Sequence, residues 1–329
     1  MVFLYKITKE KPFKYIVYLC LSVVMIVLLS ACGSGSTQRT AAQPSALPSH
    51  DATSPTPRLS PTPAPTSTVT PTPSQTPLPT QTYTPTPDTR PDPQLWGGWQ
   101  IVPTVSGVAQ EIYQRGLANG NDPRVFSVIG DCQSEPNVFL GYYETQWYVL
   151  SDKYKYLQDT IDYFKGSFSR KSLAVRDGMS APTALSALWA DKNSCEPDEN
   201  PVACELRVRK PSIIFINLGT NWRPDASPKA YEKYLRQIVD LVIANGTLPV
   251  LSTKADNVEG NNGINLVTAQ VAHDYDIPLL NFWLAANSLP NHGLDEARKN
   301  IYLTPEGWDL RNFTALETLD ALRKALVVK

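Results

Sequence analysis

The sequence has little histidine, little cysteine and no block of positive charge. It holds three histidines and five cysteines in 329 residues, and its formal net charge is -1. Without a basic patch or stripe, nucleic acid is not an expected partner. Without a cluster of histidine and cysteine ligands, a metal enzyme is only a weak option, and we expect no metal and no cofactor.

The first thirty residues follow the plan of a secretory signal peptide. Lysines precede an apolar run, 15–29, that is too short to span a membrane comfortably. The run ends in Leu29-Ser30-Ala31-Cys32-Gly33, which resembles a bacterial lipobox with a lipidated cysteine. We therefore expect residues 1–32 to be a lipoprotein signal peptide, and Cys32 to anchor an extracytoplasmic protein to the cell membrane. The alternative, an uncleaved anchor helix, also leaves the remainder outside the cytoplasm.

Residues 33–95 are rich in Pro, Thr, Ser and Ala. This composition offers too little apolar surface to offset the entropy of ordering, and frequent proline favours extended polyproline II. We expect a disordered, semi-rigid stalk, with Ser and Thr beside Pro as permitted O-glycan positions. The remaining residues, 96–329, are long enough to form one domain with a full core.

The cysteines of this domain divide into a pair and a single residue. Cys195 and Cys204 flank a polar loop, and we expect them to form a disulfide outside the cell, with two free thiols as the alternative. Cys132 is left unpaired. Such a cysteine in a secreted protein is either buried and inert or a functional thiol.

Strand and helix patterns alternate along the domain. Buried strands are expected at 124–129, 173–175, 213–217, 248–252 and 277–282. Helices are expected at 151–166, at 181–190, from Ser227-Pro228 to Gly246, and from Thr304 to about Val328. This alternation predicts a parallel sheet with helices on both faces, a three-layer α/β/α fold of the flavodoxin-like type.

Polar turns follow two of the predicted strands. The first turn reads Gly130-Asp131-Cys132-Gln133-Ser134, and the second reads Gly219-Thr220-Asn221. The carboxyl ends of strands in an open α/β sheet are where reactive side chains and helix-start N–H groups gather. The two turns resemble the first and third blocks of the SGNH (GDSL) hydrolase superfamily, and the resemblance covers most of residues 124 to 325.

The resemblance assigns a nucleophile and an oxyanion hole. Cys132, after Asp131, stands at the position of the family's nucleophilic serine, and a thiolate is intrinsically a strong nucleophile. Ser134 would need a shifted turn to serve instead. Ala181, in the segment Arg176-Asp177-Gly178-Met179-Ser180-Ala181, stands where the family has a glycine. Its backbone N–H remains, and Asn221 matches the asparagine that completes the hole.

The family's last block, Asp-x-x-His-Leu before the final helix, supplies the base and its orienting carboxylate. Here Lys299 and Tyr302 stand at these two positions. A tyrosine with an ordinary pKa of about 10 is a poor base at neutral pH. His292, three residues before Asp295, is the candidate substitute, because a triad is recognised by geometry rather than order. The alternative is a solvated loop histidine.

Four further side chains are candidates for binding. Thr220, Trp222 and Arg223 adjoin Asn221 at the same mouth, and aromatic and arginine side chains suit sugar or carboxylate recognition. The alternative for this segment is simple packing of the loop. Lys254 follows the strand at 248–252 and either binds substrate, adjusts Cys132, or is a solvated lysine beside a helix cap.

Two functions follow from these residues. The first is a surface lipoprotein that hydrolyses ester or acyl groups, with acylated cell-envelope carbohydrate as a possible substrate, through Cys132 and an oxyanion hole with Asn221. The alternative is a catalytically inactive SGNH-like binding lipoprotein that retains the pocket. The sequence supports this alternative because the serine, aspartate and histidine of the family's catalytic triad are all replaced.

Overall fold

The computed structural model describes residues 88–327 of the chain. The expected signal peptide, the lipidation site Cys32 and nearly all of the expected stalk lie outside the described residues. Within the described part, no helix is both long enough and apolar enough to cross a membrane.

A four-stranded parallel sheet lies at the centre of the domain, in the order β1-β2-β3-β4. The strands are β1 Asp122–Gly130, β2 Pro211–Asn217, β3 Leu248–Ser252 and β4 Leu279–Leu280. Val175 adds a parallel bridge to Gly130, on the edge of β1 that β2 leaves open. With this bridge counted as a strand, the order is the 2-1-3-4-5 arrangement of flavodoxin-like sheets.

The predicted strands at 124–129, 213–217 and 248–252 are confirmed. The prediction of a strand at 173–175 is wrong, because only Val175 pairs with β1. The predicted strand at 277–282 is too long, because Asn281 caps a helix with its side chain and Phe282 begins that helix.

Helices lie before β1, between consecutive strands and after β4. They are α2 Gly107–Ala118, α3 Gln158–Tyr163, α4 Ala181–Ala184, α5 Pro201–Arg209, α6 Pro228–Ala244, α7 Gly263–Tyr275, α8 Phe282–Ala286 and α9 Pro305–Leu326. Ser227 and Thr304 cap α6 and α9 as predicted. The predicted helices at 151–166 and 181–190 are each broken, into η4 Asp152–Leu157 followed by α3, and into α4 followed by η5 Ala187–Trp189.

Neighbouring residues of a strand point to opposite faces and identify the helices on each face. Phe126 of β1 makes edge-on ring contacts with Phe164, directly after α3, and with Phe215 of β2. Phe215 also contacts Phe139, and the Arg311 guanidinium of α9 lies over the Phe139 ring. α3 and α9 therefore cover the same face of the sheet.

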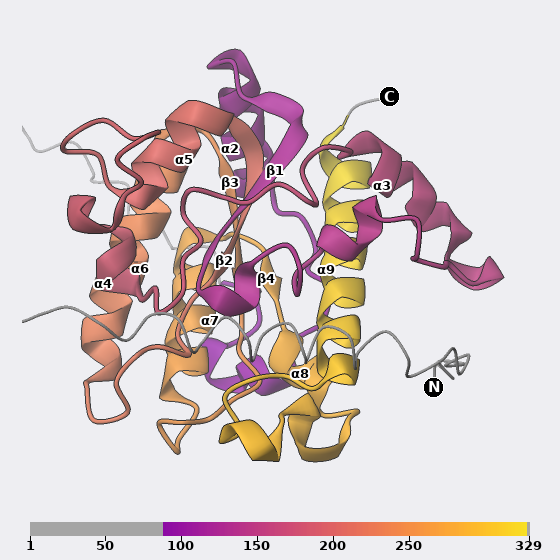
Figure 1. Ribbon diagram of the computed structural model, residues 1–329, viewed down its shortest axis with the longest axis vertical. Helices are drawn as coiled ribbons and strands as arrows, with labels where there is room; N and C mark the ends of the chain where they lie inside the picture. The colour runs from indigo at the N-terminus through magenta and orange to yellow at the C-terminus, as the bar shows by residue number, and fades with distance from the viewer. Residues whose placement is uncertain (1–87, 328–329) are drawn as a thin grey trace, which may run out of the picture. The chain divides into compact units, whose positions relative to one another are not determined.

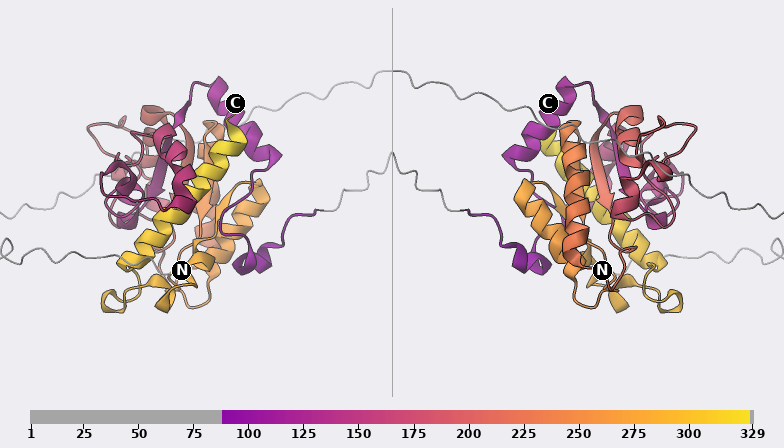
Figure 2. Two further views of the ribbon diagram at one scale, coloured as in Figure 1. Left: turned by 90° about the vertical axis from the view of Figure 1, so that its right-hand side faces the viewer. Right: turned by 90° about the vertical axis from the view of Figure 1, so that its left-hand side faces the viewer.

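Ser127 points to the other face, where its hydroxyl donates to Glu205 of α5. α5 contacts α6, and α6 packs against α7, so these helices form the other layer. Figure 1 shows α5 and α6 on one side of the strands and α9 on the other. In the two side views, α9 is foremost from one side and α6 from the other (Figure 2). The predicted three-layer α/β/α fold is confirmed.

Glu205 is a fully buried acid that ties α5 to the sheet and to the segment before the site. Besides Ser127, it accepts a hydrogen bond from the Leu173 N–H at 2.7 Å and lies 3.9 Å from Arg170. A buried carboxylate is unfavourable unless such partners compensate it. Its partners therefore hold residues 170–175 beside β1 and fix the start of the segment that reaches Ala181.

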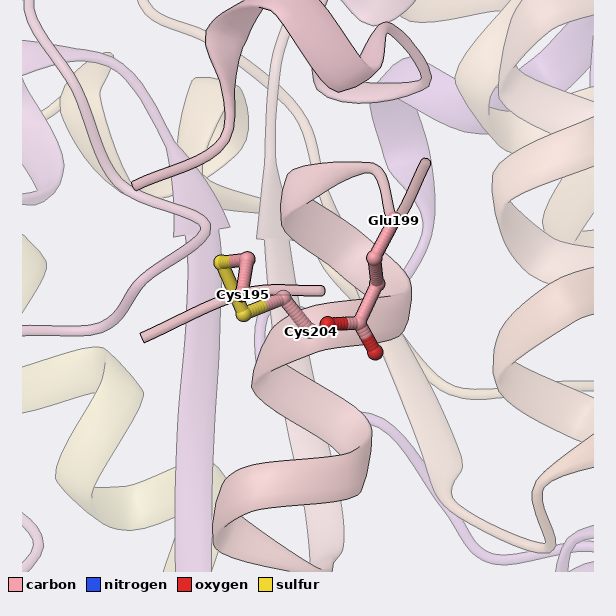
Figure 3. Close-up of side chains that lie close together, drawn as sticks. All are labelled: Cys195, Glu199 and Cys204. Carbon is pink, nitrogen blue, oxygen red and sulfur yellow. A yellow bond between two sulfur atoms is a disulfide. The ribbon is translucent and has the colours of Figure 1, made fainter. Parts of the chain in front are cut away.

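The predicted disulfide between Cys195 and Cys204 is confirmed, and it joins the loop before α5 to that helix (Figure 3). The Glu199 carboxylate and the two sulfurs lie within 4.8 Å of one another. Metal binding by cysteine requires thiolates, and both sulfurs are bonded to each other here. Glu199 accepts hydrogen bonds from Arg207 instead. The group is a cross-link rather than a metal centre.

We expect the double substitution Cys195→Ser and Cys204→Ser to destabilise the domain. For a sequence separation of 9 residues, the chain-entropy model gives a loss of about 2–3 kcal/mol in the free energy of unfolding. Urea unfolding of the full chain measures the loss. Cys132→Ser is the matched control because it leaves the disulfide intact. Equal stability of the double variant and the wild type would contradict this account.

Candidate functional site

The turn after β1 is shaped by Gly130 and Asp131. A Cβ at Gly130 would lie 2.2 Å from Ser134 Oγ, so a side chain there cannot be accommodated without a shift of the turn. Asp131 is buried and accepts a hydrogen bond from the Gln133 N–H at 2.9 Å, which caps the turn η2 Cys132–Ser134. Cys132 is thereby held, half-buried, at the carboxyl end of β1.

Gln133 holds the Tyr302 segment against this turn. Its Nε2 donates to the Ile301 carbonyl at 3.0 Å, and the Leu303 N–H donates to its Oε1 at 3.3 Å. One side-chain amide therefore binds the backbone on both sides of Tyr302. Arg311 of α9 donates to the Gln133 carbonyl at 2.8 Å and fixes this residue in turn.

Two polar side chains, Asp177 and Tyr302, lie close enough to the Cys132 thiol to affect its pKa. Burial, followed by the negative charges of Asp131 and Asp177, raises the pKa of Cys132 to about 11. Tyr302 acts in the opposite direction but does not outweigh them. At neutral pH, Cys132 is therefore a protonated thiol rather than a thiolate.

Tyr302 occupies the family's histidine position and does lie at the nucleophile. The Arg298 guanidinium stacks over its ring at 3.5 Å from the centroid, a cation–π contact that orients the phenol. The neighbouring Cys132 and partial burial raise the pKa of Tyr302. The phenol thus keeps its proton and is suited to donating a hydrogen bond or a proton.

Asn221 reaches the Cys132 turn, but its amide is already engaged. Nδ2 donates to Asp131 Oδ2 at 3.1 Å and to the Met179 carbonyl at 3.2 Å. An amide nitrogen carries two hydrogens, so a substrate oxygen must displace one of these bonds. Cys132 and Ala181 are the first residues of η2 and α4, so their N–H groups have no hydrogen-bond acceptor within those helices. Both suit an oxyanion hole.

Asp131 is placed to orient its neighbours rather than to react. Its two oxygens accept from the Gln133 N–H and from Asn221, so the first and third sequence blocks are joined through it. Burial raises the pKa of Asp131 to about 6, against the opposing effects of the Gln133 hydrogen bond and the Arg311 charge. Burial also lowers the pKa of Arg311 to about 10.

The remaining predicted residues of the chemistry make their described contacts with groups other than the thiol. His292 packs its ring against Trp283, with centroids 5.9 Å apart, and the described contacts of Cys132 give its role as base no support. Asp295 accepts from the Ala297 N–H and caps a short turn. Ser134 is buried behind the turn, and Gly178 has a positive φ of 73° in the turn that precedes Met179.

The predicted binding residues separate into two groups. Trp222 packs against Tyr231 and donates to the Ala226 carbonyl, and Arg223 pairs with Asp225, so both stabilise their own loop. Thr220 and Lys254 instead line a cavity with an enclosed volume of about 40 Å³. Lys254 is buried and pairs with Asp256 and Glu259, at 2.6 and 2.7 Å.

The sequence predictions missed three residues of the site: Gln133, Asp177 and Arg298. Asp177 lies within the segment matched to the family's second block, so its position beside the oxyanion hole was the available signal. Gln133 adjoins Cys132, but its backbone contacts with residues 301 and 303 depend on the folded chain. Arg298 acts on Tyr302 through the turn η7 Glu296–Arg298, which has no signal in the sequence.

No protein-family model and no curated protein matches the chain. Among solved structures it is similar to an esterase of Pseudoalteromonas sp., with 17% identity, a TM-score of 0.41 and coverage of 62% of this chain and 98% of that one. A GDSL-like lipase of Bacteroides thetaiotaomicron has 15% identity, a TM-score of 0.40 and coverage of 66% and 98%. AlinE4, an SGNH-hydrolase family esterase, has 18% identity and a TM-score of 0.33, with coverage of 63% of this chain and 98% of that one.

The pKa of Cys132 predicts how fast the thiol is alkylated. Because the thiolate is the reactive form, the rate should rise with pH until about pH 11, the pKa of the group. Asp177→Asn removes a negative charge from the thiol, lowers its pKa and should speed alkylation several-fold at pH 8. Iodoacetamide labelling, followed by mass spectrometry of the Cys132 peptide, measures the rate.

Asp225→Asn is the matched control, because Asp225 is an exposed carboxylate that pairs with Arg223 rather than with the thiol. It should leave the labelling rate unchanged. A rate that levels off near pH 8 in the wild type would contradict the protonated state described for Cys132.

Proposed function

We propose that the chain hydrolyses ester or acyl groups, with Cys132 as the nucleophile. The observation that carries the proposal is the placement of a carboxylate, Asp177, and a phenol, Tyr302, close enough to the Cys132 thiol to shift its pKa. The N–H groups of Cys132 and Ala181 supply oxyanion donors beside them. Nucleophile, proton acceptor and proton donor therefore come from three segments that meet at one edge of the sheet.

The protonated thiol requires that attack and proton transfer occur together. Sγ forms a bond to the acyl carbon while the thiol proton passes to Asp177, and the backbone N–H groups bind the developing oxyanion. As the carbon–oxygen bond breaks, Tyr302 donates its phenolic proton to the leaving oxygen. Water then attacks the thioester and returns a proton to Tyr302, while Sγ leaves and recovers its proton from Asp177. All three groups end as they began.

A catalytically inactive binding protein is the second candidate, and two observations favour it. The pKa of Cys132 is about 11, so little thiolate exists at neutral pH. Both hydrogens of the Asn221 amide are used within the protein. In this case the mouth around Cys132 would bind an acyl-bearing ligand without turning it over.

We further propose that the protein is an extracytoplasmic lipoprotein, anchored through Cys32, whose substrate is an acylated glycan of the cell envelope. The lipobox-like residues around Cys32 and the signal-peptide plan before it support the anchor. The disulfide between Cys195 and Cys204 supports an oxidising compartment, because such bonds are rare in the cytosol. The substrate class rests on the family resemblance alone.

Hydrolysis of short acyl esters by the full chain tests the catalytic proposal. Because Asp177 takes the thiol proton during attack, we expect turnover that does not follow the thiolate population and stays level around neutral pH, well below the Cys132 pKa of about 11. Cys132→Ala should abolish it, and Asp177→Asn should lower kcat by roughly 10²–10⁴-fold, the usual contribution of a general base. A p-nitrophenyl acetate assay and an acetylated-sugar assay, each run across pH, give the two profiles.

Asp177→Asn distinguishes a role of Asp177 as a base from a purely electrostatic effect of its negative charge. As a base, Asp177 is needed for hydrolysis, so the substitution slows turnover although it speeds alkylation of the same thiol. If Asp177 acts only through its charge, both rates rise together. If the wild type shows no turnover at any pH but binds the acetylated sugar, the inactive binding protein is the better description.

Cys32→Ser tests the anchor. In cells that export the chain, we expect this variant to leave the membrane fraction, because the acyl chains attached to Cys32 supply the attachment. Cys20→Ser, in the apolar run before it, is the matched control and should stay in the membrane. Retention of Cys32→Ser in the membrane would favour an uncleaved anchor helix.

A further inference from the structure

We propose that the cavity beside the Cys132 turn is a separate binding site for a small neutral group that carries both a hydrogen-bond donor and an acceptor, such as a carboxamide or hydroxyl. The cavity lies at the carboxyl ends of β2 and β3 and is lined by residues that include Asn217, Thr220 and Lys254. Cys132 and Tyr302 are not among its lining residues.

Asn217 is the residue that points to a ligand. It is the last residue of β2, lies in the lining of the cavity and is 9% exposed. Both its Oδ1 and its Nδ2 are buried, and neither has a hydrogen-bond partner in the part of the chain that is described. Buried amide groups are nearly always paired, so an occupant that both donates and accepts is the expected partner.

The polar groups around Asn217 are already satisfied. The Lys254 ammonium uses its three protons on the Asp256 carbonyl, Asp256 Oδ1 and Glu259 Oε2. The Thr220 hydroxyl donates to Asp256 Oδ2 at 2.7 Å. Thr253 donates to Asn281 Oδ1 and accepts from the Trp283 N–H. Among the amides and hydroxyls of this wall, the Asn217 amide is therefore the one whose donor and acceptor both lack a described partner.

The charges of the wall favour a neutral occupant. Lys254 is compensated by Asp256 and Glu259, and Arg311 lies within the electrostatic influence of Asp131. Neither Lys254 nor its two carboxylate partners is left unpaired, so an ion entering on this side would lose its hydration without gaining a free counter-charge.

The apolar walls and the size of the cavity limit the ligand further. Leu218, Phe282 and Leu294 line the same space and offer packing for a few carbon atoms. The enclosed volume is about 40 Å³, which limits the occupant to a group of a few heavy atoms. A carboxamide, N-acetyl or hydroxyalkyl group fits these limits.

This site goes beyond the proposed hydrolysis and does not depend on it. Asp131, Ile301 and Leu303, the chain neighbours of Cys132 and Tyr302, form part of the wall of the cavity. A ligand can therefore bind there whether or not Cys132 reacts. Loss of turnover in Cys132→Ala and loss of binding in an Asn217 variant are separate results.

Nitrogen-15 NMR of the full chain tests the site with acetamide as the probe. The side-chain NH₂ pair of Asn217 is assigned by its disappearance in Asn217→Leu, a substitution of similar volume without donor or acceptor. We expect the NMR signals of this NH₂ pair to shift and then reach a plateau as acetamide is added to the wild type. The shift should be equal in Cys132→Ala. Sodium acetate, of similar size but charged, should move these signals far less.

The result that would overturn the proposal is an Asn217 NH₂ pair that does not move, or that moves linearly without saturation, with acetamide. An equal response to acetate would overturn the neutral ligand class. If Asn217→Leu fails to fold, Asn217→Ala provides the same assignment. Thermal unfolding is the second measurement: acetamide should raise the Tm of the wild type more than that of the Asn217 variant, and equal shifts would also overturn the site.

Discussion

The site depends on one side-chain amide, that of Gln133. It follows the candidate nucleophile in sequence and hydrogen-bonds to the backbone on both sides of Tyr302. These bonds carry no chemistry themselves, but they join the turn after β1 to the segment before α9. Arg311 extends the connection from α9 to the Gln133 carbonyl. The distance between the thiol and the phenol is therefore set by the backbone rather than by two flexible side chains, which is what preorganisation requires.

The electrostatics of this arrangement differ from those of a histidine-based site. An imidazolium beside a cysteine stabilises the thiolate, whereas here Asp131 and Asp177 place negative charge near the sulfur. The raised pKa of the thiol is the direct result. Arg298 supplies positive charge, but it lies over the Tyr302 ring. A nucleophile in these surroundings has to lose its proton during attack, and this makes the carboxylate of Asp177 the group on which turnover depends.

The sequence predicted the frame of the molecule better than its site. The buried β-branched run at 213–217, the buried apolar run at 248–252, and the capped starts of α6 and α9 are local signals that survive folding. The strand predicted at 173–175 failed because Glu205 and Ser172, rather than a ladder, take the backbone groups of that segment. Asn221 was predicted to approach the thiol turn, and it does so through Asp131. Gln133 and Arg298 could not be found from sequence, because their partners come from distant or irregular segments.

The same sheet edge holds two kinds of polar residue, and hydrogen bonding distinguishes them. Asp131 and Lys254 are buried with their polar atoms fully engaged, which is the pattern of residues that hold a structure together. The Asn217 amide is equally buried but unpaired within the described protein. An unpaired buried amide destabilises the fold, so its retention at the carboxyl end of β2 requires a compensating partner. A charged residue at this edge is therefore a weaker indicator of function than a neutral one left without a bond.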